Sequence, residues 1–222
     1  MDEWFTLYTG GTGEIEEKKS RFIATIEPVS SEEEAAAFIA SMKKKYWDAR
    51  HNCSAFVIGA NGEKTRCSDD GEPSGTAGRP MLDVLTGERV TDAAVTVTRY
   101  FGGTLLGTGG LVRAYSSAVK TALSNCGIIK KVMGYRLSAE CDYNDHGKLT
   151  HMAGAKGYHI LNTEYGQNVT VDILTDDAAV LAADITETTS GRAKLSAPVP
   201  AVYAVINGEV KLFEANEIRA GS

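Results

Sequence analysis

The sequence predicts an α+β protein with two domains, and three observations support this. Short β-branched runs alternate with segments of helical periodicity along the whole chain. The pattern of elements changes after Lys131. The charge changes too, because residues 1–134 carry 16 Lys+Arg against 17 Asp+Glu, whereas residues 135–222 carry 7 against 12. We therefore place the domains at residues 1–133 and 134–222.

Composition narrows the function classes. Of the 222 residues, 43% are hydrophobic and 23% are charged, which is typical of a globular protein rather than a disordered one. No apolar run approaches the roughly 18 residues of a membrane span, and the acidic N-terminus lacks the apolar region of a secretory signal. We expect a cytoplasmic protein without membrane contacts. Its net charge of −6 disfavours general DNA or RNA binding by the acidic second half, while the first half is near neutral.

The first elements follow from local signals. Residues 15–29 are typical of a strand with a polar beginning and an apolar end. Ser31–Glu34 forms a capping box before a helix whose apolar residues, Ala35 to Met42, recur at helical spacing. Lys43–Lys45 lies in the last turn of that helix, where cations suit the helix dipole. The lysine run is thus explained without an RNA site.

A hairpin is expected next, with strands at 52–59 and 63–68 around Asn61-Gly62, a type I′ turn signal. This turn places Phe56 opposite Cys67, so that Cys53 lies on the other face of the sheet. A disulfide or shared zinc site is not expected in this register, although a slip by one residue would reverse that. The four cysteines are predicted to be free thiols.

The next elements lie around two glycine-rich segments, residues 68–80 and 98–114. A short helix is expected from Pro80 to Leu85, ending at Gly87, and a β-branched strand at Ala93–Tyr100. A second helix follows Gly109-Gly110, with Gly127 as its C-terminal cap. Glycine weakens regular structure and allows the backbone to approach another group closely. These segments therefore form either a local fold that requires such close contacts or a binding surface.

The second half predicts a ferredoxin-like sandwich, because its elements follow the order βαββαβ. The expected elements are a strand at 135–143, a helix at 144–155, a hairpin of 157–165 with 168–174, a helix at 177–188 and a closing strand at 202–206.

Four segments carry a resemblance to a known family: KKSRFIA at 18–24, HNCSAFVIG at 51–59, SDDGEPSGTAGRP at 68–80 and TRYFGGTLLGTGGLVRAYSSAV at 98–119. With these segments the sequence resembles the YigZ/IMPACT family over most of residues 15–125. The acidic second half is similar to the C-terminal domain of the bacterial YigZ-type members.

The resemblance implies an N-terminal α/β sandwich similar to domain IV of elongation factor G, and a C-terminal domain similar to that factor's ferredoxin-like domain V. Eukaryotic members of the family act in translational control, by competing for a protein that activates a stress kinase. They carry a further N-terminal domain, and we do not expect this chain, which shows no such domain, to share their partner.

A candidate anion or RNA site combines three arginines with glycines. Gly109-Gly110 leads into a helix whose free backbone N–H groups suit a phosphate, and Tyr100 and Phe101 offer rings on which a base can stack. The candidate contact residues are Arg79, Arg99, Gly102, Gly103, Gly109, Gly110 and Arg113. The alternative is that Asp69, Asp70 and Glu72 pair with these arginines and only hold the loops in place.

An enzyme is the second hypothesis. Asp69, Asp70 and Glu72 offer oxygen ligands for a divalent cation, as in a small metal-dependent hydrolase. His51 and Cys53 point to the same side of one strand, but their backbones are too far apart for easy contact. The GTGG sequence at 107–110 lacks the GK[ST] ending of a phosphate-binding loop, so no GTPase is indicated.

The leading hypothesis is a non-catalytic cytoplasmic binding protein in translation or RNA metabolism, without a cofactor. Its expected partner is RNA, the ribosome or a translation-linked protein, and no DNA partner is expected. The hydrolase is the alternative, and a purely protein-binding regulator is the third reading.

Overall fold

The computed structural model describes residues 3–213, whose contacts divide the chain into two compact units. The N-terminal unit comprises Trp4–Lys130, and the C-terminal unit comprises residues 131–213 with Glu3. The predicted boundary between residues 133 and 134 falls within a continuous strand, β8 (Gly127–Cys141). The α+β class with two domains is confirmed, whereas separate folding of residues 1–133 and 134–222 stays a prediction.

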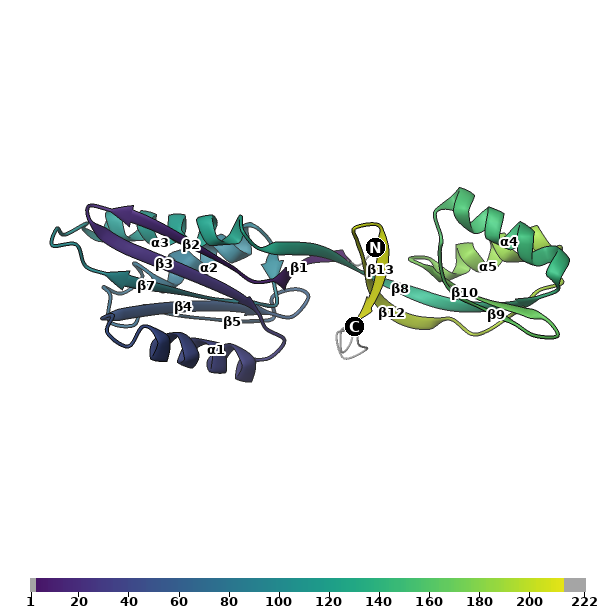
Figure 1. Ribbon diagram of the computed structural model, residues 1–222, viewed down its shortest axis with the longest axis horizontal. Coiled ribbons are helices and arrows are strands. Elements are labelled where there is room, and N and C mark those ends of the chain that lie inside the picture. The colour runs from purple at the N-terminus through teal and green to yellow at the C-terminus, as the bar shows by residue number, and fades with distance from the viewer. Residues whose placement is uncertain (1–2, 214–222) are drawn as a thin grey trace. The chain divides into compact units, whose positions relative to one another are not determined.

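The N-terminal unit is built on a five-stranded antiparallel sheet in the order β2-β3-β7-β4-β5. Helix α1 covers one face of this sheet, and α2 and α3 cover the other (Figure 1). Outside it, β1 and β6 form a short parallel pair. The strands are β1 (Glu3–Thr9), β2 (Gly11–Glu17), β3 (Ser20–Pro28), β4 (His51–Ile58), β5 (Lys64–Ser68), β6 (Val90–Thr91) and β7 (Ala93–Tyr100). The helices are α1 (Glu32–Lys45), α2 (Gly78–Gly87) and α3 (Thr108–Leu123).

Alternation along the strands explains why both faces of this sheet are covered. On the α2/α3 side, one set of alternate residues forms the main core with Tyr115, Ala118 and Ala122 of α3. On the α1 side, Phe56 and Ala94 form a smaller core with Ala35. Because neither face is left to solvent, β4 and β7 are buried along nearly their whole length.

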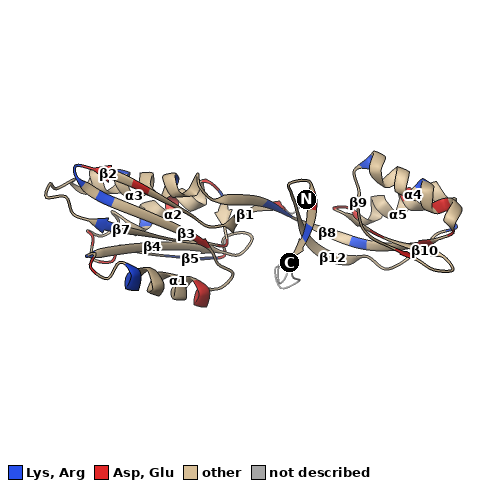
Figure 2. Ribbon diagram, in the orientation of Figure 1, with Lys and Arg blue, Asp and Glu red and all other residues tan. Residues whose placement is uncertain are grey.

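The expected start of α1 is confirmed. Ser31 is its N-cap, and the Ser31 hydroxyl accepts a hydrogen bond from the Glu34 N–H at 3.2 Å. Figure 2 shows the acidic first turn and the basic last turn of this helix. Of the three lysines in the last turn, Lys43 forms an ion pair with Asp70.

Two predictions for the N-terminal unit are wrong. The single strand expected at 15–29 is broken by a turn at Lys18-Lys19, both of which have positive φ, so that β2 and β3 form a hairpin. Neither Lys18 nor Lys19 is a residue type that signals a turn, as glycine or asparagine would be, so this turn carried no local signal. Gly127 does not cap α3, because the helix ends at Leu123 with Ser124 as its C-cap and Gly127 begins β8.

The β4–β5 hairpin is present, but its register differs by one residue from the predicted one. Ala55, rather than Phe56, lies opposite Cys67, because residues 59–63 form a five-residue loop between Ile58 and Lys64. Cys67 therefore shares the sheet face of Cys53. Cys53 is buried, Cys67 is exposed, and both are free thiols in the structure. Although they lie on the same face of the sheet, no disulfide links them.

The C-terminal unit has a sheet in which β10 lies between β8 and β9, with β11 and β12 paired to the other edge of β8. Helices α4 and α5 pack on one face of this sheet, against alternate residues of β8 and β10 (Figure 1). The elements after β8 are α4 (Tyr143–Lys156), β9 (His159–Tyr165), β10 (Val169–Thr175), α5 (Ala178–Thr189), β11 (Lys194–Leu195), β12 (Val199–Ile206) and β13 (Glu209–Phe213). The predicted elements of this half are present, with β8 beginning earlier than expected. In residues 3–213, no helix combines the length and the apolar character that crossing a membrane requires.

Candidate functional site

One end of the N-terminal unit collects both glycine-rich segments, and we call it the loop end. It comprises residues 18–19, 46–50, 69–77 and 101–107, with the first turns of α2 and α3. Hydrogen bonds join these segments: the Gly102 N–H donates to the Ser20 hydroxyl at 3.1 Å, and the Tyr100 hydroxyl donates to Asp48 at 2.8 Å. The Arg99 guanidinium donates to Glu72 at 2.7 Å, which joins the two glycine-rich segments. The two segments that the sequence singled out therefore lie against one another and against the ends of β2 and α1.

Arg99 lies beneath this surface in a buried ion pair. Its Nη1 is 2.7 Å from Glu72 Oε1, and the two side chains are only 8% and 3% exposed. The Tyr115 hydroxyl donates to the same Glu72 oxygen at 2.8 Å, and the Cys53 thiol donates to the Tyr115 oxygen at 3.3 Å. The alternative in which the acidic loop pairs with the arginines thus holds for Arg99.

Two further groups of this buried network, the Tyr115 hydroxyl and the Cys53 thiol, stay uncharged. Burial, followed by the proximity of Cys53 and Glu72, raises the pKa of Tyr115 far above its usual value. Burial also raises the pKa of the Cys53 thiol to about 12. Since thiolate is the nucleophilic form, Cys53 is an unreactive structural thiol. His51 Nδ1 instead lies 3.0 Å from the Asp70 carbonyl oxygen.

Asp69 holds the first glycine-rich loop together. Its carboxylate accepts hydrogen bonds from the backbone N–H groups of Gly75, Ala77 and Gly78, at 2.8, 3.0 and 2.8 Å. Burial acts to raise the pKa of Asp69, but these three donors outweigh it and hold the pKa below its usual value. Because Ala77 and Gly78 begin α2, Asp69 already supplies the anion that this helix N-terminus favours.

The three acidic residues do not share a site. Asp70 accepts from the Asn52 N–H at 2.7 Å and pairs with Lys43, Asp69 binds the backbone of its own loop, and Glu72 binds Arg99. Within residues 3–213, no group of three His, Cys, Asp or Glu residues could hold a metal ion. The hydrolase alternative requires these oxygens on one cation, so this geometry does not favour it.

Close packing explains two of the candidate glycines. A Cβ on Gly102 would meet the Lys19 carbonyl carbon at 2.0 Å, because the backbone of this loop presses on the β2–β3 turn. Gly103 has φ +88°, a conformation that side chains rarely adopt. A Cβ on Gly110 would lie 2.9 Å from the Leu106 Cβ. These positions are required by the local fold, whether or not a ligand binds.

Gly109 and Arg113 differ from those positions. Apart from the adjacent residues and the backbone of α3, Arg113 Nη1 is the one atom of residues 3–213 within 4 Å of a Cβ on Gly109, at 3.7 Å, so the guanidinium lies over the first turn of α3. The N-cap of α3, Gly107, provides no side-chain hydrogen bond. Arg113 is exposed, and no described residue forms an ion pair with it. Of the three arginines, this one is available to a ligand.

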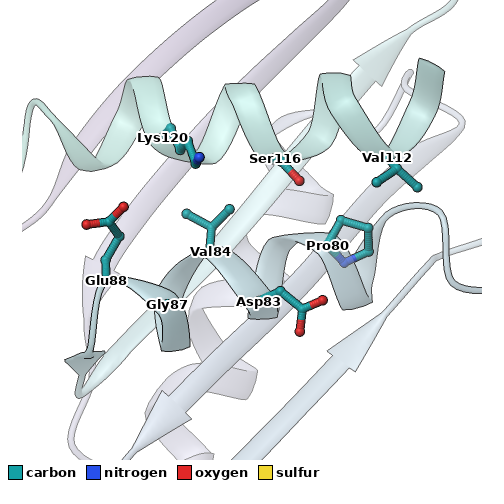
Figure 3. Close-up of a pocket in the computed structure, with 8 residues that line it drawn as sticks. All are labelled: Pro80, Asp83, Val84, Gly87, Glu88, Val112, Ser116 and Lys120. Carbon is teal, nitrogen blue, oxygen red and sulfur yellow. The ribbon is translucent and has the colours of Figure 1, made fainter. Parts of the chain in front are cut away.

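Arg79 is exposed as well, but it pairs with Asp83 one turn later on α2, at 2.7 Å. Figure 3 shows how the two helices lie: Pro80 faces Val112 near their beginnings, and Glu88 lies beside Lys120 farther along. The helices therefore run in the same direction, and both begin at the loop end. The open groove of about 370 Å³ between them is mixed in charge, with Asp83, Glu88 and Lys120 at its rims.

Of the three most exposed apolar side chains of the loop end, sequence reasoning named Phe101 as a stacking ring but missed Trp47 and Leu105. Trp47 and Leu105 are each 82% exposed, and Phe101 is 54% exposed. A tryptophan directly after an amphipathic helix and a Leu-Leu pair between glycines were signals in the sequence, but exposure depends on the neighbouring elements. Large apolar residues gathered on one end of a unit mark an interaction surface.

Comparison with known proteins gives matches to both halves. Residues 18–123 match the model of the Impact N-terminal domain, and residues 140–192 match a domain of unknown function, DUF1949. IMPACT family member YvyE of Bacillus subtilis is 39% identical over 197 residues, covering 88% of this chain and 91% of that protein. IMPACT family member YigZ of Escherichia coli is 39% identical over 74% of this chain and 82% of its own length.

A crystal structure described as that of a hypothetical protein is 35% identical to this chain, with a TM-score of 0.58, and the match covers 89% of this chain and 98% of the other. The two domain matches lie in the order that the sequence resemblance predicted. On these grounds the chain belongs to the IMPACT family, in its bacterial YigZ/YvyE type with an Impact N-terminal domain followed by DUF1949.

Proposed function

We propose that the protein is a non-catalytic cytoplasmic binding protein that contacts RNA or the ribosome through the loop end of its N-terminal unit. The observation that carries this proposal is the exposed Arg113 guanidinium over the first turn of α3, next to a loop with exposed apolar side chains. Unpaired helix N–H groups, a cation and exposed rings are the chemistry that binds phosphate and base.

The fold of the acidic C-terminal unit gives further support to this proposal. Its strand order, β9-β10-β8 with β11 and β12 beyond, is compatible with a ferredoxin-like fold of the kind found in domain V of elongation factor G. The likeness of the N-terminal unit to domain IV of that factor rests on the family resemblance. Two units that each resemble a domain of one translation factor support a role in translation.

Salt dependence tests the proposal directly. Retention of RNA and of purified ribosomes would be measured for the full chain at several salt concentrations, together with Arg113→Ala. The variant should bind more weakly, and its log–log salt dependence should flatten by about one unit for the lost phosphate contact. Arg89→Ala, an exposed arginine beyond the far end of α2, serves as the matched control and should bind as the parent does.

Two outcomes would contradict the proposal. If the parent chain retains neither RNA nor ribosomes at low salt, the binding function is wrong, and a purely protein-binding regulator becomes the better hypothesis. If Arg113→Ala and Arg89→Ala weaken retention equally, binding reflects overall charge rather than the loop end.

A further inference from the structure

Phe101 is held in an unusual position at the loop end. The Arg99 guanidinium carbon lies 5.6 Å from the centre of the Phe101 ring and 5.5 Å from the centre of the Phe22 ring. Arg99 and Phe22 are both more than nine-tenths buried, yet Phe101 is 54% exposed. A buried cation therefore lies over the Phe101 ring, while about half of this residue stays exposed.

The cation beneath the ring is fixed. Glu72 holds Nη1 of Arg99 at 2.7 Å, and Tyr115 holds Glu72 in turn. Gly102, the next residue, is pressed against the backbone of Lys19 and Ser20. The ring is thus held in place by Arg99 beneath it and by the tightly packed Gly102 that follows it. A planar ligand that stacks on the ring therefore need not first order the Phe101 side chain.

The surroundings of the ring carry positive charge. Gly102 brings Phe101 to the turn at Lys18-Lys19, where both lysines are exposed. Glu17 before them and Asp48, which binds the Tyr100 hydroxyl, offset part of this charge. A ring bordered by cations suits a ligand in which a flat base alternates with phosphate. An apolar segment of a protein partner would gain nothing from those lysines.

From this geometry we infer that Phe101 is a stacking platform for an unpaired base of single-stranded RNA, positioned by the buried Arg99–Glu72 pair. The inference rests on the proposed function and deepens it, since it specifies an unstacked base rather than a duplex. Phe101 touches the base, whereas Arg99 and Glu72 are positioning residues that act through the ring. Stacking tolerates any base, so little sequence preference is expected.

The test uses the full chain and a labelled 12-nucleotide single-stranded RNA of mixed sequence, followed by fluorescence anisotropy. Phe101→Leu keeps an apolar side chain but removes the π face, and should weaken binding by about fivefold or more. Phe101→Tyr keeps the face and should bind within about twofold of the parent. The melting temperature of each variant is measured alongside, to show that the loop end is still folded.

Tyr165→Leu is the matched control, because Tyr165 is an exposed ring, 66% exposed, that lies in the C-terminal unit and outside the proposed surface. It should leave RNA affinity unchanged. The fully paired duplex of the same sequence should bind more weakly than the single strand, with no dependence on Phe101. A single-stranded DNA of the same sequence distinguishes the source of the base, and weaker binding than RNA is expected.

Specific outcomes separate the two proposals. If RNA binds but Phe101→Leu binds as tightly as the parent, or if Tyr165→Leu weakens binding as much as Phe101→Leu, the stacking inference is overturned and RNA binding stands. Preference for the duplex, or for DNA, overturns it too. Absence of any RNA binding, with or without ribosomes, removes the proposed function and the inference together.

Discussion

The two units each contain an arginine bound to a buried carboxylate, but they use it differently. In the N-terminal unit, Arg99 and Glu72 are both buried, and the pair supports an exposed loop from beneath. In the C-terminal unit, Arg192 grips both oxygens of Asp145 at 2.8 and 2.7 Å, while its own side chain stays 53% exposed. The first pair places charge inside a core beneath an exposed loop, whereas the second joins the start of α4 to the chain after α5.

This difference indicates which unit to test for a binding site and which to test for ion pairs that stabilise its own fold. In the C-terminal unit, ion pairs such as Lys156–Asp184 and Lys194–Glu140 join charged groups of the same unit. The N-terminal unit contains such pairs too, as between Arg79 and Asp83, but among the described residues none forms an ion pair with its exposed Arg113. The following changes test the comparison, from the largest expected effect to the smallest.

Arg99→Ala should be the most damaging. It strands the Glu72 carboxylate in the core, and breaking a buried pair typically costs about 3–5 kcal/mol of unfolding free energy. Urea denaturation followed by circular dichroism would measure the loss. Adding Glu72→Gln to Arg99→Ala should recover part of it, because no charge is then left unpaired. A loss below about 1 kcal/mol would show that the pair is solvated and that the comparison between the units is mistaken.

Gly102→Ala should cost less, about 1–3 kcal/mol, because the new methyl group would overlap the Lys19 backbone and force the loop away from the β2–β3 turn. Gly109→Ala is the matched control in the same segment, with space for a methyl group, and should change stability little. Thermal melts of the two variants provide the measurement. Equal melting temperatures would mean that the loop is not pressed against the turn.

Asp145→Asn should act only over part of the pH range. Hydrogen bonds from Arg192 and Lys148 lower the pKa of Asp145 from 3.8 to about 2. Because the pKa is lower in the folded state, the carboxylate stabilises the fold above about pH 4, and this contribution is lost as the pH falls towards 2. The melting-temperature difference between parent and variant should therefore be largest near pH 5 and shrink on acidification. A difference independent of pH would exclude this ion pair as its origin.

Arg79→Ala should have the smallest effect. Its pair with Asp83 is exposed and spaced i, i+4 on α2, so its loss should cost about 0.5 kcal/mol or less. Chemical denaturation can place it beside Arg99→Ala on one scale. If the two arginine variants lose similar stability, exposure does not separate structural from available arginines in this unit.

Much of the secondary structure and the family could be predicted from the sequence, because those signals are local. The Ser31 cap, the strand at Ala93–Tyr100 and the α4 and α5 helices follow from capping residues and periodicity, which depend on a few neighbouring side chains. The turn at Lys18-Lys19 carried no such signal, and the β4–β5 register depended on whether two or five residues form the loop. In both cases pairing with other strands decided the outcome.

For the candidate site, the sequence by itself determined which residues are present: two glycine-rich segments, three arginines and three carboxylates close along the chain. Only the tertiary structure decided their roles. Arg99, Arg113 and Arg79 are chemically identical, yet one is buried against Glu72, one lies free over a helix start and one pairs along its own helix. Burial and partner are set by contacts between residues far apart in the chain, and a linear pattern of residue types does not contain them.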